Sequence, residues 1–263
     1  MAASPEDTFT VLEHLSELRR RMFWVIVVLI AGVIAAAIFN ERLFDLLLYP
    51  LNQVAGLDVD SYKIITLSPT EPFMVSLKVW VVASLLVSSP FLIWQLWAFV
   101  GPAFTSTEKR YFYPVVLATI TLFLGGVVFG YLIVLPKGLS FLLNFGGSTF
   151  NVQNRASEYF TFVALFILAF GAIFELPVVL VLLAKVGVID DKFLRKNRRY
   201  AIVISALVAA FLTPGQDAFS MVAMLVPLLV LYEVSIPIAR LVQPKPERSA
   251  GAKDADDLAA GAT

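Results

Sequence analysis

Long runs of apolar residues are the feature that most constrains how this chain can fold. Residues 22–39 and 114–135 contain no charged side chain, and residues 73–97 and 159–184 contain one each, Lys78 and Glu175. A helix of about 20 apolar residues crosses the ~30 Å hydrocarbon core of a bilayer. With 59% hydrophobic and 15% charged residues, the chain also has too few polar side chains to coat a water-facing surface. The four runs therefore predict transmembrane helices.

Two shorter apolar blocks follow, at residues 201–213 and 218–239. Between them, Pro214 and Gly215 predict a tight turn, and Asp217 predicts the start of a helix. A pair of short spans and a re-entrant hairpin both fit, and both return the chain to the same side of the membrane. We favour two short spans. The predicted fold is an all-α integral membrane protein with six transmembrane helices, the last two short.

The distribution of lysine and arginine predicts the orientation of these spans. Fifteen of the 20 basic residues fall in segments on one side, four fall on the other, and Lys78 lies inside a span. The positive-inside rule then places the N- and C-termini in the cytoplasm. We expect a membrane domain over residues 1–242 and a disordered cytoplasmic tail over residues 243–263, which are rich in Pro, Ala, Gly and charged residues. The first span is expected to be an anchor and not a cleaved signal.

The charge balance and the rarest residue types argue against several functions. The net charge is +0, so no basic field attracts nucleic acid. There are no cysteines and one histidine, which argues against thiol catalysis, metal sites and serine–histidine catalysis. No motif for nucleotide binding is present. We therefore expect no enzyme activity, no cofactor, no metal and no nucleic-acid partner.

The first candidate site lies just before the first span, from His14 to Arg21. Apolar residues recur there at helical spacing, which predicts an amphipathic helix that continues into the span. On this helix His14, Glu17 and Arg21 share one face, whereas Arg19 lies about 200° from Glu17 and is not its partner. Two interpretations stay open: Glu17 pairs with Arg20 or Arg21 of its own helix, or it receives an external ligand.

Three further segments contain candidate residues. Glu108 follows the second span and is either a surface acid that complements a helix dipole or a ligand-binding group. Glu175 lies inside the fourth span beside Pro177, which predicts a kink, and a carboxylate at this depth is by default a functional candidate. The long connector 40–72 contains a leucine-rich stretch that predicts an interfacial helix ending at Pro50, which would cap the outer face.

In this order along six spans, the motifs of the chain resemble the TatC family, the polytopic core of the twin-arginine protein translocase. The matching segments run from Leu12 to Glu233 and include HLSELR at 14–19, YPL at 49–51, SPTEPF at 68–73, QLWAFVGP at 95–102, EKR at 108–110, FGAIFELP at 170–177, LRKNR at 194–198 and LTP at 212–214. The family often has a second proline in the last outer turn, where this chain has Gly215.

The resemblance implies a receptor in the cytoplasmic membrane. It implies binding of signal peptides with consecutive arginines, and transport of folded proteins driven by the proton motive force with TatA- and TatB-type single-span partners. It further implies a homo-oligomeric complex in the lipid bilayer. The signal-peptide contacts of the family fall on His14, Glu17, Arg19, Phe99, Pro102 and Glu108. Its intramembrane partner contact falls on Glu175, and its outer cap includes Pro50, Phe73 and Asp217.

Two other classes of protein were weighed against this interpretation. A proton- or ion-coupled transporter would suit Glu175 beside a kinked helix, but such proteins usually cluster polar residues at the membrane midplane. An intramembrane hydrolase needs a nucleophile and a base within its spans. Ser84, Ser88 and Ser89 are available as nucleophiles, but no histidine or second carboxylate accompanies them inside a span.

Overall fold

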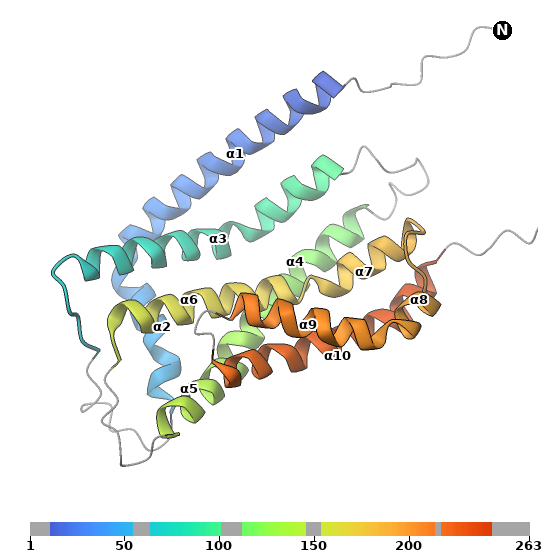
Figure 1. Cartoon of the computed structure of the whole chain (residues 1–263). Coiled ribbons are helices and arrows are strands. Elements are labelled where there is room, and N and C mark those ends of the chain that lie inside the picture. Colours follow the sequence, from blue (N-terminus) through green and yellow to red (C-terminus); the bar gives the residue numbers. More distant parts are fainter. Residues whose placement is uncertain (1–10, 55–63, 101–111, 146–153, 214–216, 244–263) are drawn as a thin grey trace, which may run out of the picture.

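The computed structural model describes residues 11–54, 64–100, 112–145, 154–213 and 217–243. Within these ranges the regular elements are helices, apart from an isolated bridge between Ile65 and Arg155. The predicted all-α class is therefore confirmed (Figure 1). The helices are α1 (Val11–Ile38), α2 (Asn40–Asn52), α3 (Glu71–Val100), α4 (Phe112–Phe129), α5 (Leu135–Asn144), α6 (Ala156–Ile173), α7 (Leu176–Lys185), α8 (Asp191–Lys196), α9 (Arg198–Leu212) and α10 (Ala218–Val242), with a π-helical turn at Gly130–Val134 between α4 and α5.

Five helical stretches of the described residues are long and apolar enough to cross a bilayer. They are His14–Ile38, Glu71–Phe99, Phe112–Asn144, Ala156–Lys185 and Ala218–Val242. Helix α9 has 15 residues and falls short of the roughly 20 that a span needs. Helix α10 has 25 residues, so the expectation that both final helices are short is wrong for α10. The helix runs three residues beyond the predicted end at residue 239, and Glu233 on it pairs with Arg198 at 2.7 Å.

The fourth hydrophobic run is broken at the predicted place. Helix α6 ends at Ile173, and α7 begins at Leu176 with Pro177 in its first turn. Proline has no N–H to donate to the carbonyl four residues before it, so the helix cannot continue through this point without a break. The break lies beside Glu175, whose backbone N–H bonds the carbonyl of Ala172 at 3.1 Å.

The helix ends gather at two opposite ends of the bundle (Figure 1). One end, here called the arginine end, holds the start of α1, the end of α3, helix α8 and the end of α10. The other, here called the cap end, holds α2, residues 64–70, α5 and the starts of α6 and α10. The start of α9 lies at this end too, and seven arginines of the described residues lie on these helix segments: Arg19, Arg20, Arg21, Arg195, Arg198, Arg199 and Arg240.

Helix α2 at the cap end does not end at Pro50, as the sequence predicted, but runs two residues further to Asn52. Pro50 cannot donate to the carbonyl of Leu46. The hydroxyl of Tyr131 donates to that carbonyl instead, at 2.7 Å. A tertiary hydrogen bond thus replaces the missing helical one, and Pro50 is tolerated inside the helix.

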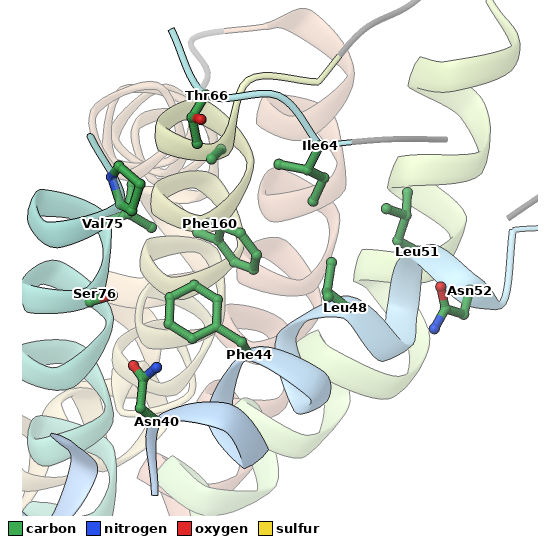
Figure 2. Close-up of a pocket in the computed structure, with 12 residues that line it drawn as sticks. Asn40, Phe44, Leu48, Leu51, Asn52, Ile64, Thr66, Val75, Ser76 and Phe160 are labelled. Atoms are coloured by element: carbon green, nitrogen blue, oxygen red, sulfur yellow. The ribbon is translucent and has the colours of Figure 1, made fainter. Parts of the chain in front are cut away.

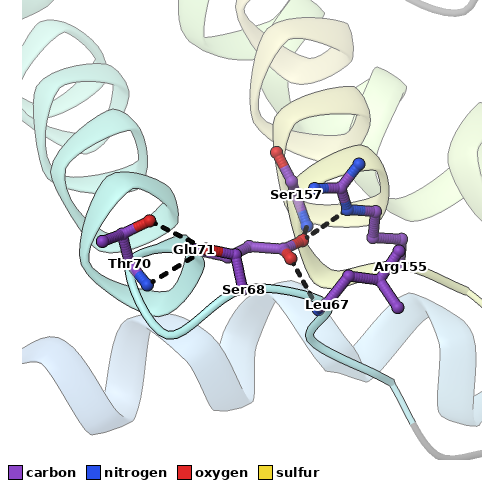
Figure 3. A network of polar contacts seen from close by, with 6 residues as sticks. All are labelled: Leu67, Ser68, Thr70, Glu71, Arg155 and Ser157. Atoms are coloured by element: carbon purple, nitrogen blue, oxygen red, sulfur yellow. Dashed lines mark hydrogen bonds and ion pairs between the residues drawn. The ribbon is translucent and has the colours of Figure 1, made fainter.

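A buried carboxylate ties the cap end together. Glu71, at the start of α3, accepts hydrogen bonds from the backbone N–H of Leu67 at 2.8 Å, the backbone N–H of Ser157 at 3.0 Å and Arg155 Nε at 2.9 Å (Figure 3). Its side chain is 3% exposed. Burying a carboxylate is favourable only when it is paired and hydrogen-bonded. Glu71 therefore joins the segment before α3 to the first turn of α6.

The hydrophobic core is centred on α6. Phe166, Phe170 and Val163 are almost fully buried. In contrast, α1 lies at the edge of the bundle and packs mainly against α3 (Figure 1). The two helices approach closely at Gly32, beside Ser84, whose hydroxyl donates to the carbonyl of Leu29 at 2.8 Å. The position of the first candidate site therefore depends on how α1 packs against α3.

Candidate functional site

The candidate site at the arginine end forms where the start of α1 meets the end of α3. The imidazole of His14 stacks on the ring of Phe99, with centroids 4.3 Å apart and an interplanar angle of 21°. Glu17 lies one turn further along α1 and is partly buried. Two of the residues expected to act together, His14 and Phe99, are thus in direct contact although 85 positions apart in the sequence.

Arg21 connects Glu17 to α3. Its Nε and Nη2 donate to the same oxygen of Glu17, Oε1, at 3.0 Å and 2.5 Å. Nη1 donates to Gln95 Oε1 at 2.9 Å, and Nη2 also donates to the carbonyl of Ala98 at 3.1 Å. Of the two open interpretations for Glu17, the internal pairing is therefore present, with Arg21 and not with Arg20.

The other oxygen of Glu17, Oε2, accepts no hydrogen bond from the described part of the chain. Arg19 and Arg20 are exposed, and neither forms an ion pair with a described residue. Where α1 meets α3, the site therefore presents a carboxylate oxygen of Glu17 beside the ring pair of His14 and Phe99. Pro102 and Glu108 lie outside the described residues, so their places in this site stay predictions.

The candidate inside the membrane, Glu175, lies at the break between α6 and α7. Its Oε1 is buried and has no hydrogen-bond partner among the described residues. Leaving a buried oxygen without a hydrogen bond costs about 1–3 kcal/mol. Binding of a hydrogen-bond donor from outside the described residues would remove this cost. Glu175 lies between α6 and α7, which pack against α3, α4 and α10, whereas Glu17 lies on the edge helix α1, so the two candidates occupy different parts of the bundle.

The three cap-end residues have different environments. Pro50 is almost fully buried, Phe73 is 59% exposed, and Asp217 caps α10 by accepting the backbone N–H of Ser220 at 2.7 Å. The helix start predicted at Asp217 is therefore confirmed. A cavity of about 610 Å³ lies between α2, α3 and α6, with Phe44 and Phe160 on its walls (Figure 2). Pro50 and Phe73 do not line it.

Sequence reasoning missed the residues that join distant segments. Gln95 was seen only as part of a motif, and nothing in the sequence indicated that it holds Arg21. Glu71 and Arg155 were likewise not recognised as an ion pair, although a charged residue at the edge of an apolar run is a signal worth following. Among the described residues, no group of His, Asp and Glu side chains is arranged to hold a metal ion.

Comparisons with known proteins agree with this architecture. The sequence model described as "Sec-independent protein translocase protein (TatC)" matches residues 13–227. The protein of that name from Carboxydothermus hydrogenoformans is 36% identical over 240 residues, which cover 91% of this chain and 96% of the relative. The one from Aquifex aeolicus is 38% identical over 235 residues, covering 89% and 95%.

A solved structure gives the same result in three dimensions. The crystal structure titled "Twin Arginine Translocase Receptor- TatC" aligns with a TM-score of 0.76 and 38% identity, covering 88% of this chain and 99% of that one. The family model spans well over half of the chain, and the matched relatives are covered almost completely. This chain therefore belongs to the TatC family of Sec-independent protein translocase proteins.

Proposed function

We propose that this protein is the receptor subunit of the translocase and binds the consecutive arginines of signal peptides at its arginine end. The observation that carries the proposal is the junction of α1 and α3. There Glu17 is fixed by Arg21 through one oxygen while its second oxygen accepts no bond from the described residues. A guanidinium group is a good match for a carboxylate held in this way, because it donates in a planar fork.

The neighbouring groups favour the same ligand. The stacked rings of His14 and Phe99 present an aromatic surface, on which an arginine side chain packs better than a lysine. In this proposal Glu17 receives one arginine of the signal and Glu108 the other. Arg19, on a different face of α1, orients a carboxylate or a peptide carbonyl. Pro102 shapes the floor of the pocket beside Phe99.

As a member of the TatC family, the protein is a multi-pass component of the cytoplasmic membrane and belongs to a transport system, not to a catalytic family. We infer that α9 is the sixth span, which requires a locally thinned bilayer for its 15 residues. With six spans, the positive-inside rule places the arginine end and both termini in the cytoplasm. Signal peptides of cargo would then meet Glu17 before crossing.

We further propose that Glu175 is the contact for a partner helix. An apolar helix carrying one polar side chain would supply the donor that Oε1 lacks among the described residues. TatA- and TatB-type single-span proteins have this character. The proposed complex contains several copies of this chain with such partners. Transport of folded cargo through it would draw on the proton motive force, since no nucleotide-binding motif is present.

The test of the receptor proposal is the binding of a fluorescent peptide with an Arg-Arg signal to the full-length protein in nanodiscs, compared with a Lys-Lys peptide. We expect the Arg-Arg peptide to bind more tightly, and Glu17→Gln and Glu108→Gln each to weaken its binding about tenfold or more. Glu41→Gln is the matched control, because Glu41 is an exposed acid on α2 at the cap end. Equal binding of the Arg-Arg peptide to wild type, Glu17→Gln and Glu108→Gln would refute the two-carboxylate site.

The role of Glu175 is tested separately. Glu175→Ala is expected to reduce co-purification of the TatA- and TatB-type partners while leaving the affinity for the Arg-Arg peptide within about twofold of wild type, because the two sites share no residue. A loss of peptide binding as large as that of Glu17→Gln would contradict this separation.

A further inference from the structure

The guanidinium of Arg21 is held more firmly than a simple surface ion pair requires. It donates four hydrogen bonds, two to Glu17 on its own helix and one each to Gln95 and Ala98 on α3. The side chains of Arg21 and Glu17 are 21% and 19% exposed. An incoming arginine that displaced Arg21 from Glu17 would have to break two hydrogen bonds and move a guanidinium that Gln95 and Ala98 also hold, so exchange of one arginine for the other is unfavourable. Arg21 therefore stays in place when a ligand arrives.

Arg21 occupies only one of the two carboxylate oxygens of Glu17. Arg21 uses two donors on Oε1, where a fork-to-fork pair would engage both oxygens. Oε2 keeps its lone pairs and receives no bond from a described residue. A second guanidinium can therefore bind the same carboxylate from the opposite side, with Arg21 fixing the direction in which Oε2 points.

The pairing with Arg21 also weakens the electrostatic attraction of Glu17 for other cations. Because the charge of Glu17 is largely compensated by Arg21, a distant or poorly aligned positive charge gains little Coulomb energy there. A lysine ammonium is a compact, strongly hydrated charge, which binds mainly through that Coulomb energy. A guanidinium is more weakly hydrated and gains from directed hydrogen bonds and from stacking on an aromatic ring such as the exposed imidazole of His14, which lies on Phe99. The pairing thus penalises lysine more than arginine.

Resting on the proposed receptor function, we infer that Arg21 is a specificity-determining residue. Arg21 neutralises Glu17 and fixes the direction of Oε2. The site then favours an arginine, which forms directed hydrogen bonds, over a lysine, which offers mainly positive charge. Arg21 acts through Glu17 and Gln95 and is a positioning residue, which does not itself touch the signal peptide.

The first experiment uses the unaltered protein in nanodiscs and three fluorescent peptides that differ only at the paired positions: Arg-Arg, Lys-Lys and citrulline-citrulline. Citrulline keeps a planar group with N–H donors but carries no charge. If shape dominates, the order of affinity is Arg-Arg, then citrulline, then Lys-Lys. Binding of Lys-Lys more tightly than citrulline would mean that charge dominates, and would overturn the inference.

The second experiment measures the ratio of the Lys-Lys to the Arg-Arg dissociation constant in variants. Arg21→Gln is expected to lower this ratio at least about fivefold, because Glu17 regains its charge and loses its fixed direction. Arg20→Gln is the matched control: it removes the same charge from the next, exposed position and should leave the ratio within about twofold. An unchanged or increased ratio in a folded Arg21→Gln protein would refute the role of Arg21.

Failure of the receptor site and failure of the role of Arg21 give different results. If wild type shows no preference for Arg-Arg over Lys-Lys, the proposed receptor site itself is wrong. If wild type prefers Arg-Arg but the peptide order and the Arg21→Gln ratio follow charge alone, only the role of Arg21 is wrong. Size-exclusion profiles and helical content of each variant show whether it is folded, and the peptide order in wild type decides the question if Arg21→Gln does not fold.

Discussion

The close approach of α1 and α3 at Gly32 allows a test of how α1, which carries the arginine-end site, is held against α3. A Cβ atom added at Gly32 would lie 3.0 Å from Ser84 Cβ and 3.3 Å from Ser84 Cα, and closer still to Ser84 Oγ. Carbon atoms in good contact are roughly 3.5–4.0 Å apart. Gly32→Ala must therefore push the helices apart or turn the Ser84 side chain away from the carbonyl of Leu29.

Both responses destabilise the protein. Overpacking of this kind costs about 1–3 kcal/mol. Loss of the Ser84 hydrogen bond alone costs about 0.6 kcal/mol, the average for such bonds between membrane helices. We expect Gly32→Ala to lower the free energy of unfolding by about 1–3 kcal/mol, and Ser84→Ala to lower it by less. The free energy is measured by circular dichroism in mixed micelles titrated with sodium dodecyl sulfate.

Two comparisons isolate the steric effect. Gly125→Ala is the matched control, because a Cβ at Gly125 meets no atom within 4 Å. In a Ser84→Gly background Oγ and Cβ are gone and only the backbone Cα, at 3.3 Å, remains close, so adding Gly32→Ala should cost clearly less than it does in the wild type. The reasoning is refuted if Gly32→Ala is as stable as Gly125→Ala, or if its cost is the same with and without Ser84→Gly.

Two further predictions concern the cap end. Glu71→Gln should lower the midpoint of thermal unfolding in detergent more than Glu158→Gln does. Glu71 is a buried acceptor for Arg155 and two backbone N–H groups, whereas Glu158 is an exposed acid at the same end of the bundle. Equal midpoints for the two variants would contradict this prediction. Tyr131→Phe should lower the free energy of unfolding by about 0.5–1.5 kcal/mol, because the carbonyl of Leu46 loses the hydroxyl donor that replaces the N–H missing at Pro50. The control Tyr113→Phe changes an exposed tyrosine and should leave the free energy of unfolding unchanged.

The two ends of the bundle are held together in different ways. At the cap end, the buried carboxylate of Glu71 joins α3 to α6 through Arg155 and Ser157, and the hydroxyl of Tyr131 joins the π-helical turn to α2. At the arginine end, α1 is attached to α3 through the bonds of Arg21, and further along the two helices through the close contact of Gly32 with Ser84. A site on the edge helix can therefore be changed by small shifts of α1 that leave the core around α6 in place.

Much of this protein was predicted from local sequence. The apolar runs gave the membrane helices, since a bilayer requires about 20 apolar residues in each span. Pro177 predicted the break between α6 and α7, and Asp217 the start of α10, because both effects act within one helical turn. The order of short motifs was enough to identify the family, and the comparisons confirm it. The same local rules failed at Pro50, where a tertiary contact compensates for a residue expected to end a helix.

Only the tertiary structure decided which distant side chains meet. The helical wheel placed His14, Glu17 and Arg21 on one face of α1, but it gave no information about what that face contacts. The packing of α1 on α3 brought Gln95 to Arg21 and Phe99 to His14, and it selected Arg21 over Arg20 as the partner of Glu17. Hydropathy and helical periodicity are set by neighbours in sequence, whereas these contacts depend on the rotation and separation of two packed helices and join residues more than 70 positions apart.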